Sequence, residues 1–335
     1  MIVKLTAPSP NWPLLLQTPG GEGMWDGVRF TTDPSCDEAD AWVVYEGLTR
    51  RTTVVCPPSR TILATGEPPM IKSYPEAFTA QFARVLTCHA LSHPGIVARQ
   101  QALPWHYGRE FDVAGGERFV ESYDTLAGSS PFEGKTGLIS VVCSAKRGRE
   151  GHRIRDEFVS YLERIQIPGL DIFGTGRQRV AACKRDAIMP YRYHIVMENS
   201  VCPHYWTEKL ADCYLGGAFP FYWGCPNLEE YFSSGAFAPI DIERPEEAVG
   251  VMLEAMESGV FERSAPLLRE SRELVLNRYN LFPTLVSMLA EMPESNPEPV
   301  TVRPEESFTL RGRIRRARLG ARALYRRARD LDSYA

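Results

Sequence analysis

The segment from residue 137 to residue 223 constrains the fold most, because short apolar runs alternate there with helix-like patterns. It opens with a continuous apolar run, which is typical of a parallel strand buried on both faces. The expected strands are residues 137–143, 170–173, 193–197 and 218–223, and the expected helices between them are 154–165 and 206–215. Strands that alternate with helices at this spacing predict an α/β fold with a doubly wound parallel sheet.

The predicted helix at 206–215 carries an unusual residue in its first turn. Gly216 and Gly217 end this helix, and Lys209 lies near its beginning. Backbone N–H groups and the helix dipole already make a first turn electropositive, which disfavours a cation unless an anion lies opposite. A phosphate is the commonest such anion. The alternative is an exposed lysine that forms an ion pair with Asp212, one turn later.

Other polar residues are expected at the same edge of the predicted sheet. Ligands of doubly wound sheets bind beyond the carboxyl ends of the strands. The residues that follow the strands or begin the helices there are Arg155, Glu198, Asn199, Glu208 and Lys209. The sequence therefore predicts one ligand-binding edge with both cations and carboxylates.

The N-terminal part predicts a second, separate α/β domain. Its expected strands are residues 41–45, 52–56, 60–65 and 84–87, and its expected helix is 75–82. The polar segment 111–132 ends near a GSSPFEG sequence that is typical of a linker. We therefore expect domains at 1–130 and 131–290, followed by a linker and a basic tail at 291–335.

The C-terminal tail has a pattern of its own. Residues 293–307 are rich in Pro and Glu and favour a linker. In residues 310–331 apolar side chains step by four and three among arginines, which predicts a basic amphipathic helix at an anionic membrane surface. Each arginine near such a surface contributes on the order of 1 kcal/mol. A helix on an acidic protein surface, a short coiled coil and a disordered basic tail are the alternatives.

Composition excludes several classes of protein. The net charge of −4 gives no reason to expect a nucleic-acid partner. No apolar run reaches transmembrane length, and the first residues lack the apolar core of a signal peptide. The eight cysteines contain no CxxC pair, so we expect reduced thiols in a cytosolic protein and no zinc site.

Several motifs in order resemble the donor-binding domain of the α-1,3/4-fucosyltransferases, glycosyltransferase family ten. They are Met197-Glu198-Asn199-Ser200, Tyr205-Trp206-Thr207-Glu208-Lys209, Gly217-Ala218-Phe219-Pro220 and Trp223-Gly224-Cys225-Pro226. The resemblance is clear from about residue 137 to residue 283, faint before it and absent in the tail. It implies a GT-B fold, in which two Rossmann-like domains enclose a cleft.

The resemblance also implies roles for individual residues. Ile154-Arg155-Asp156-Glu157-Phe158 matches the family motif whose arginine binds the diphosphate, which implicates Arg155. The residues implied to contact the nucleotide sugar are Glu198, Asn199, Tyr205, Glu208 and Lys209. Lys209 would neutralise the negative charge that develops on the leaving diphosphate. A solvated helix arginine and a first-turn glutamate that suits the helix dipole are the alternatives for Arg155 and Glu208.

An inverting transfer needs a base that accepts the proton of the acceptor hydroxyl. In the family this base is a glutamate in an N-terminal Thr-Gly-Glu motif, and Thr65-Gly66-Glu67 matches it here. The resemblance therefore implies that Glu67 is the catalytic base and that Glu208 is a second catalytic residue. An ordinary turn glutamate is the alternative for Glu67, and three histidines are alternative bases: His89, His93 and His106.

Absent motifs narrow the chemistry further. The globular part has no Asp-x-Asp triplet of the kind that holds a divalent cation against a diphosphate. It has no P-loop either, and the Gly174-x-Gly176 pair lacks the third glycine of a dinucleotide-binding motif. We therefore expect no metal and no cofactor, and a diphosphate neutralised by lysine, arginine and helix termini.

The expected function is an inverting, metal-independent transfer of fucose from GDP-fucose to a hydroxyl of a surface glycan or glycolipid. The expected place is the cytoplasm, at the inner face of a bacterial membrane. Trp206 stands where the family has a small β-branched residue, so the donor class is better supported than the donor sugar. The alternatives are a transferase for another GDP-sugar and an inactive relative that binds glycan or membrane.

Overall fold

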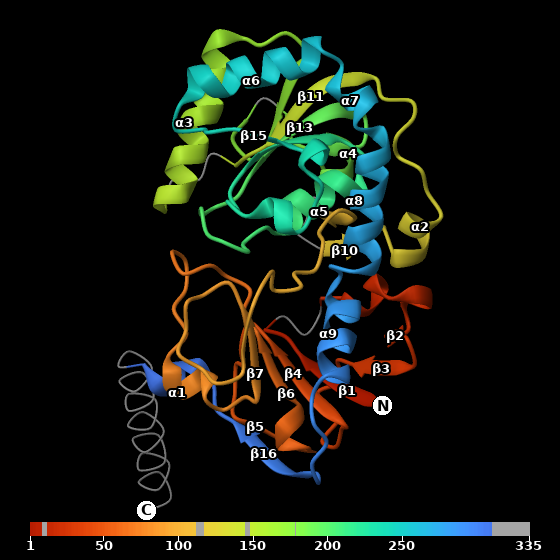
Figure 1. Ribbon diagram of the computed structural model, residues 1–335, viewed down its shortest axis with the longest axis vertical. Coiled ribbons are helices and arrows are strands. Elements are labelled where there is room, and N and C mark those ends of the chain that lie inside the picture. Colours follow the sequence, from red (N-terminus) through yellow and green to blue (C-terminus); the bar gives the residue numbers. More distant parts are fainter. Residues whose placement is uncertain (9–11, 112–116, 145–147, 178, 310–335) are drawn as a thin grey trace, which may run out of the picture. The chain divides into compact units, whose positions relative to one another are not determined.

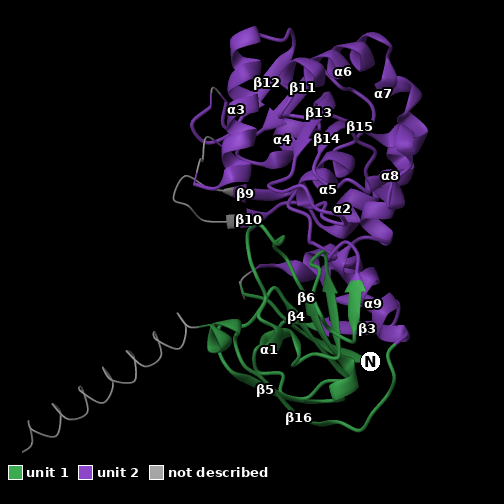
Figure 2. Ribbon diagram, turned by 60° about the vertical axis from the view of Figure 1, so that its left-hand side comes forward, with its two compact units in different colours: residues 1–10, 31–97, 292–335 green, residues 11–30, 98–291 purple. Residues whose placement is uncertain are grey.

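The structure is a computed structural model, and it describes residues 1–8, 12–111, 117–144, 148–177 and 179–309 (Figure 1). The chain forms two compact units (Figure 2). Unit 1 contains residues 1–10, 31–97 and those from 292 onward, and unit 2 contains residues 11–30 and 98–291. These units do not coincide with the expected ranges 1–130, 131–290 and 291–335. Residues 11–30 belong to unit 2 instead, where the Gln17 side-chain amide donates a hydrogen bond to the Trp105 carbonyl (2.9 Å).

Unit 1 is built on a parallel sheet. Its central strands run in the order β1 (Ile2–Thr6), β4 (Ala41–Tyr45), β6 (Thr61–Ala64) and β7 (Arg84–Thr87). β8 (Ile96–Ala98) extends this sheet beside β7, and β2 (Met24–Trp25) and β3 (Val28–Thr31) form an antiparallel pair. Every residue of β4 is buried, as a strand covered on both faces requires. The helix expected at 75–82 is a single turn, α1 (Glu76–Thr79).

The segment expected as a linker at 293–307 contains a strand, so that prediction is wrong. β16 (Glu298–Val302) pairs antiparallel with β5 (Thr52–Cys56). Val302 is fully buried in the core of unit 1, and the hydroxyl groups of Thr53 and Thr301 meet across the pair at 2.8 Å. The Pro- and Glu-rich composition predicted a linker, but the short β-branched run Val300-Thr301-Val302 within it forms part of this strand of unit 1.

Unit 2 is built on a five-stranded parallel sheet. Its order is β12 (Leu170–Phe173), β11 (Gly137–Val142), β13 (Tyr191–Met197), β14 (Phe219–Trp223) and β15 (Ala238–Pro239). All four neighbouring pairs are parallel, as the alternation of strands and helices predicted. A two-stranded ribbon, β9 (Arg109–Phe111) with β10 (Glu117–Phe119), and helix α2 (Tyr123–Ala127) precede the GSSPFEG sequence that was expected to be the linker.

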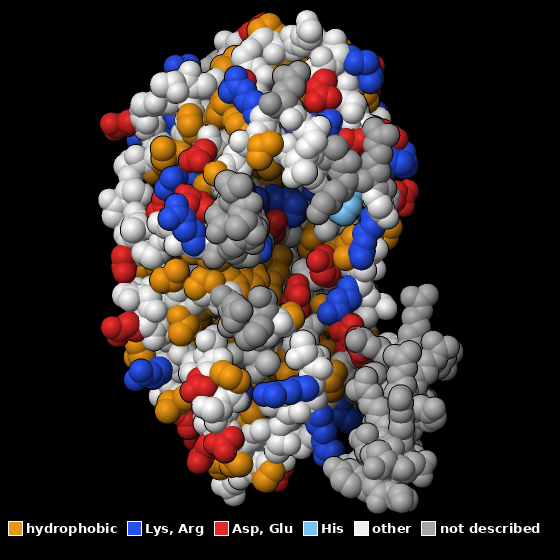
Figure 3. Space-filling view, turned by 180° about the vertical axis from the view of Figure 1, so that it is seen from behind, with side chains coloured by type: hydrophobic (Ala, Val, Ile, Leu, Met, Phe, Trp, Pro, Cys, Tyr) orange, Lys and Arg blue, Asp and Glu red, His pale blue; other side chains and the backbone are white. Residues whose placement is uncertain are grey.

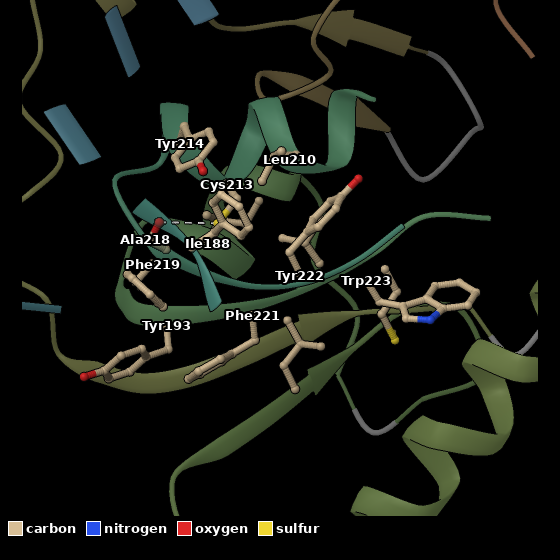
Figure 4. Packing of buried hydrophobic residues seen from close by; sticks show 14 of the residues in the cluster. Ile188, Tyr193, Leu210, Cys213, Tyr214, Ala218, Phe219, Phe221, Tyr222 and Trp223 are labelled. Carbon is tan, nitrogen blue, oxygen red and sulfur yellow. Dashed lines mark hydrogen bonds between the residues drawn. The ribbon is translucent and has the colours of Figure 1, made fainter. Parts of the chain in front are cut away.

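Helices cover both faces of this sheet. Figure 1 shows α3 (Glu150–Ile165) and α6 (Pro245–Glu257) on one side, and α4 (Lys184–Ile188), α5 (Glu208–Leu215) and α8 (Ala265–Asn277) on the other. In the close view of Figure 4, Leu210 and Cys213 of α5 lie over β14 on the side of Tyr222. Two further helices of unit 2 flank α8 in the chain, α7 (Val260–Arg263) before it and α9 (Leu281–Ala290) after it.

The expected fold class is confirmed: the protein is α/β, and each of its two units has a Rossmann-like parallel sheet. Within the described ranges, no helix combines the length and the apolarity that crossing a bilayer requires. The expected amphipathic helix at 310–331 lies outside the described residues. On the face shown in Figure 3, acidic and basic side chains are interspersed, in keeping with the small net charge.

Candidate functional site

The expected ligand-binding edge lies where β13 of unit 2 ends. Glu198 and Asn199 follow β13 directly, and Thr207 caps the N-terminus of α5 with its side chain. The Thr207 hydroxyl accepts from the backbone N–H of Lys209 at 3.3 Å. α5 begins at Glu208, two residues later than expected, and Lys209 is its second residue. Lys209 therefore lies in the first turn, as predicted.

Glu198 fixes the beginning of α5. Its carboxylate is fully buried and accepts hydrogen bonds from the Thr207 backbone N–H (2.8 Å) and hydroxyl (2.7 Å). Burial raises the pKa of Glu198, although Lys209 opposes that rise. Because both of its oxygens are engaged inside the protein, Glu198 is placed to position α5 and Lys209.

The Lys209 ammonium lies among two carboxylates and a hydroxyl. Its Nζ is 3.0 Å from Glu208 Oε1, 3.3 Å from Glu198 Oε2 and 3.0 Å from Thr207 Oγ1. Burial alone lowers the pKa of Lys209, but the two carboxylates outweigh burial and raise the pKa above its usual value. The side chain therefore stays charged. The alternative ion pair with Asp212 is wrong, because Asp212 pairs with a different lysine, Lys184 (3.0 Å).

Glu208 lies between these two lysines. Its Oε1 is 3.0 Å from Lys209 Nζ and 3.7 Å from Lys184 Nζ, and 19% of its side chain is exposed. Burial alone raises the pKa of Glu208, but the charges of Lys209 and Lys184 outweigh it and hold the pKa well below its usual range. Glu208 is therefore an ionised carboxylate with access to solvent, able to accept hydrogen bonds from hydroxyl groups.

Arg155 reaches the same edge from the other face of the sheet. Its guanidinium donates to the carbonyl oxygens of Gly151 (3.1 Å) and Met197 (3.3 Å), the last residue of β13. The expectation that Arg155 lies at a helix N-terminus is wrong: α3 begins at Glu150, which puts Arg155 in the second turn. Arg155 still lies near enough for its charge to oppose the rise in the pKa of Lys209.

Asn199 and Tyr205 contact each other. The Tyr205 hydroxyl donates to Asn199 Oδ1 at 2.9 Å, and Tyr205 itself is buried. The α3 helix approaches the Asn199 backbone so closely that a Cβ at Gly151 would lie 2.0 Å from the Asn199 carbonyl oxygen. The structure therefore brings six of the predicted site residues together at one edge of unit 2: Arg155, Glu198, Asn199, Tyr205, Glu208 and Lys209.

Sequence reasoning missed Lys184 and the buried contacts of Asp212, which lie behind Glu208. Asp212 is fully buried and accepts from the His106 backbone N–H (2.9 Å) and from the Lys184 ammonium (3.0 Å). Burial raises the pKa of Asp212 to about 6, and burial lowers the pKa of His106 to about 3. The scarcity of lysine relative to arginine was the one signal in the sequence that could have drawn attention to Lys184.

The expected base, Glu67, lies in unit 1. It follows β6, at the carboxyl edge of that sheet, and is half-buried. His89 Nε2 donates to the main-chain carbonyl of Glu67 (2.7 Å), and burial lowers the pKa of His89. His93 Nε2 donates to the Phe82 carbonyl (3.1 Å). Among the described residues, no group of three or more His, Cys, Asp or Glu side chains could hold a metal ion.

Two crystal structures have folds similar to this chain. One is of an α1,3-fucosyltransferase, with a TM-score of 0.50 and 14% identity over 88% of this chain and 91% of that chain. The other is of an α1,3-fucosyltransferase with GDP-fucose, with a TM-score of 0.49 and 14% identity over 89% and 92%. The first likeness agrees with the GT-B class that was expected from the sequence.

The sequence comparisons point to the same family. The α-(1,3)-fucosyltransferase FucT of Helicobacter pylori is 30% identical over 67 residues, which is 20% of this chain and 14% of that relative. The chain thus matches only a small part of the length of this curated relative. The family model described as glycosyltransferase family 10 (fucosyltransferase) C-term matches residues 132–255. The resemblance is thereby confirmed: residues 132–255 match the C-terminal domain of glycosyltransferase family 10.

Proposed function

We propose that the protein transfers fucose from GDP-fucose to a hydroxyl of a glycan, with inversion and without a metal ion. The family domain over residues 132–255 and the name of the Helicobacter pylori relative support fucose as the sugar. The observation that carries the proposal is the convergence of Lys209, Arg155 and an ionised Glu208 at the carboxyl end of β13. This edge is where parallel α/β sheets bind nucleotides.

The cations and the carboxylate would serve different parts of the donor. Lys209 and Arg155 would contact the diphosphate, whose negative charge grows as the bond to the sugar breaks. The sugar gains positive charge in the same step, because glycosyl transfer passes through an oxocarbenium-like transition state. An ionised Glu208 would stabilise that positive charge and accept hydrogen bonds from sugar hydroxyls. Asn199 and Tyr205 would line the same donor site, and Glu198 would hold α5 in place.

Glu67 is the proposed catalytic base for the acceptor hydroxyl. Its carboxylate would take the proton of the acceptor hydroxyl as that oxygen attacks the sugar. Glu67→Gln should then abolish transfer and leave GDP binding unchanged, because Glu67 belongs to unit 1 and the donor residues belong to unit 2. The acceptor we propose is a cell-surface glycan or glycolipid, and residues 310–331 would hold the protein at the inner face of a bacterial membrane.

Calorimetric titration with GDP, UDP and CDP tests the donor site. We expect GDP to bind in the presence of EDTA, and Lys209→Ala to weaken binding by about 1.5–3 kcal/mol, which is roughly 10- to 100-fold. The matched control is Arg192→Ala, which removes an exposed cation of unit 2 that pairs with Glu262 (3.3 Å). Equal GDP affinity of Lys209→Ala and the wild type would remove Lys209 from the diphosphate site.

The same titration separates the alternatives. A wild type that prefers UDP or CDP would contradict a GDP-sugar donor. GDP binding with hydrolysis or transfer from a different GDP-sugar would keep the donor class and change the sugar. GDP binding without turnover of any GDP-sugar would favour an inactive relative that binds glycan.

A further inference from the structure

Two lysines from neighbouring helices approach the same oxygen of Glu208. Lys209 Nζ is 3.0 Å from Oε1, and Lys184 Nζ, at the start of α4, is 3.7 Å from it. Lys184 is fixed from behind by the buried Asp212 carboxylate at 3.0 Å. The mechanism proposed above uses Lys209 and Glu208 and leaves Lys184 without a role.

The contacts of Lys209 show why a second cation matters. A lysine ammonium has three N–H donors, and Lys209 directs them at Thr207, Glu208 and Glu198. An incoming anion must therefore replace one of these contacts. Glu198 and Thr207 are buried and bonded to each other, whereas Glu208 is partly exposed. The contact with Glu208 is accordingly the one that gives way most easily.

A Glu208 carboxylate that lost its only cation would be a mostly buried charge without a partner, which proteins strongly disfavour. We propose that Lys184 is the second counter-ion of Glu208, a positioning residue that keeps this carboxylate ionised when Lys209 turns to the donor diphosphate. The inference rests on the proposed function, because it requires an anion at Lys209. It adds to that function a reason why Glu208 can stay charged beside the sugar.

The other groups that face Glu208 cannot take this part. His106 carries no charge at neutral pH, since burial lowers its pKa to about 3. Glu198, at the end of β13, and Asp212, on α5 itself, are acidic and repel Glu208. Arg155, on α3, donates to the carbonyl oxygens of Gly151 and Met197. Among the described residues, Lys184 is thus the cation that remains at Glu208 once Lys209 is engaged.

The proposal makes a thermodynamic prediction for Lys184→Met. Without Lys184, a diphosphate that draws Lys209 away must leave Glu208 uncompensated or force it to take up a proton. GDP binding then becomes coupled to proton uptake, and it weakens as the pH rises. In the wild type Lys184 prevents this coupling. A linked change of one pKa unit corresponds to a tenfold change in affinity, so we expect roughly tenfold weaker binding at the alkaline end of the range.

Calorimetry of GDP binding, in buffers of different ionisation enthalpy, measures proton uptake directly. We expect more protons to be taken up by Lys184→Met and Lys184→Gln than by the wild type. Lys184→Arg should restore the wild-type behaviour, because it restores the charge. The double variant Lys184→Met/Glu208→Gln should take up no extra proton, since the titrating carboxylate is gone. Arg192→Met is the control for loss of a cation elsewhere in unit 2.

The outcomes distinguish this inference from the function on which it rests. If the wild type binds GDP, and Lys184→Met and Lys184→Gln bind it with the same affinity and proton uptake, Lys184 is not the second counter-ion and the donor site stands. If the variants bind weakly at every pH without extra proton uptake, Lys184 contacts GDP itself or only stabilises the fold, and the inference is also wrong. A wild type that binds no GDP overturns the proposed function and this inference together.

Discussion

Substitution of Gly151 by alanine tests how closely α3 packs against the chain that follows β13 at the site. Gly151 is the second residue of α3, and an alanine Cβ there would lie 2.0 Å from the Asn199 carbonyl oxygen and 2.9 Å from its carbon. Arg155 follows one turn later, where its guanidinium donates to the Met197 carbonyl. Gly151 thus allows α3 to approach the strand end that carries the site.

Two effects of opposite sign decide the outcome. Alanine is favoured over glycine inside a helix by about 0.8–1.0 kcal/mol. Overpacking costs about 1–3 kcal/mol, and here the upper part of that range applies, because the atoms that must move are backbone atoms at the end of β13. The clash should win, so that Gly151→Ala destabilises unit 2 by about 1–2 kcal/mol. Displacement of α3 should also break the Arg155 contact and weaken GDP binding by roughly tenfold.

Gly250 supplies the matched control. It lies inside α6, and a Cβ there would meet nothing within 4 Å, so Gly250→Ala should stabilise unit 2 by about 0.5–1 kcal/mol. Urea unfolding followed by tryptophan fluorescence reports mainly on unit 2, because Trp42 is the one of the six tryptophans that lies in unit 1. If both variants were stabilised equally, α3 would not rest against Asn199, and the placement of Arg155 would be refuted.

Three further predictions concern pH and the C-terminal segment. Burial raises the pKa of Asp212 from 3.8 to about 6, so the folded protein binds this proton more tightly than the unfolded chain. The contribution of Asp212 to stability therefore falls by up to about 3 kcal/mol as the pH rises from about 4 to 6, and pH-dependent urea unfolding of Asp212→Asn should lack that fall. Deletion of residues 293–335 removes β16 from its pairing with β5 and should lower the melting temperature of unit 1. Deletion of 310–335 should preserve melting temperature and GDP binding and abolish binding to anionic vesicles, and unchanged vesicle binding would exclude the tail as the membrane contact.

The sequence predicted those elements whose pattern is local. Four strands of the unit 2 sheet, β11, β12, β13 and β14, are short apolar runs between turns, and the structure has them within one or two residues of their expected bounds. The two-residue strand β15 was not expected. The beginning of α3 was placed four residues too late, because Glu150-Gly151-His152-Arg153 carries no apolar periodicity. β16 was missed because its partner, β5, lies more than 240 residues away in the chain.

The residues of the candidate site likewise fall into two groups, those that a local pattern predicts and those that depend on contacts between elements. Lys209 was found because its position in a first turn can be read from neighbouring residues. The ion pair of Lys184 with Asp212, by contrast, joins α4 to α5. The buried bonds of Glu198 to Thr207 likewise depend on how a strand end meets a helix. Contacts of this kind leave no periodic signal, so a sequence can indicate which residues carry chemistry before it indicates which residues position them.

The balance of charge at this edge also explains what kind of anion it can select. The cations Lys209, Lys184 and Arg155 are opposed by the ionised Glu208 and, above about pH 6, by Asp212. The edge therefore holds little excess positive charge, and an anion must compete with carboxylates that are already bound to the lysines. A single phosphate would form one charge-assisted contact with Lys209 and displace one existing contact, so its net gain in binding free energy would be small. A diphosphate that reaches both Lys209 and Arg155 gains two charge-assisted contacts for the one that it displaces. Such a site should discriminate a nucleoside diphosphate from inorganic phosphate by exchange of partners, rather than by a general attraction for negative charge.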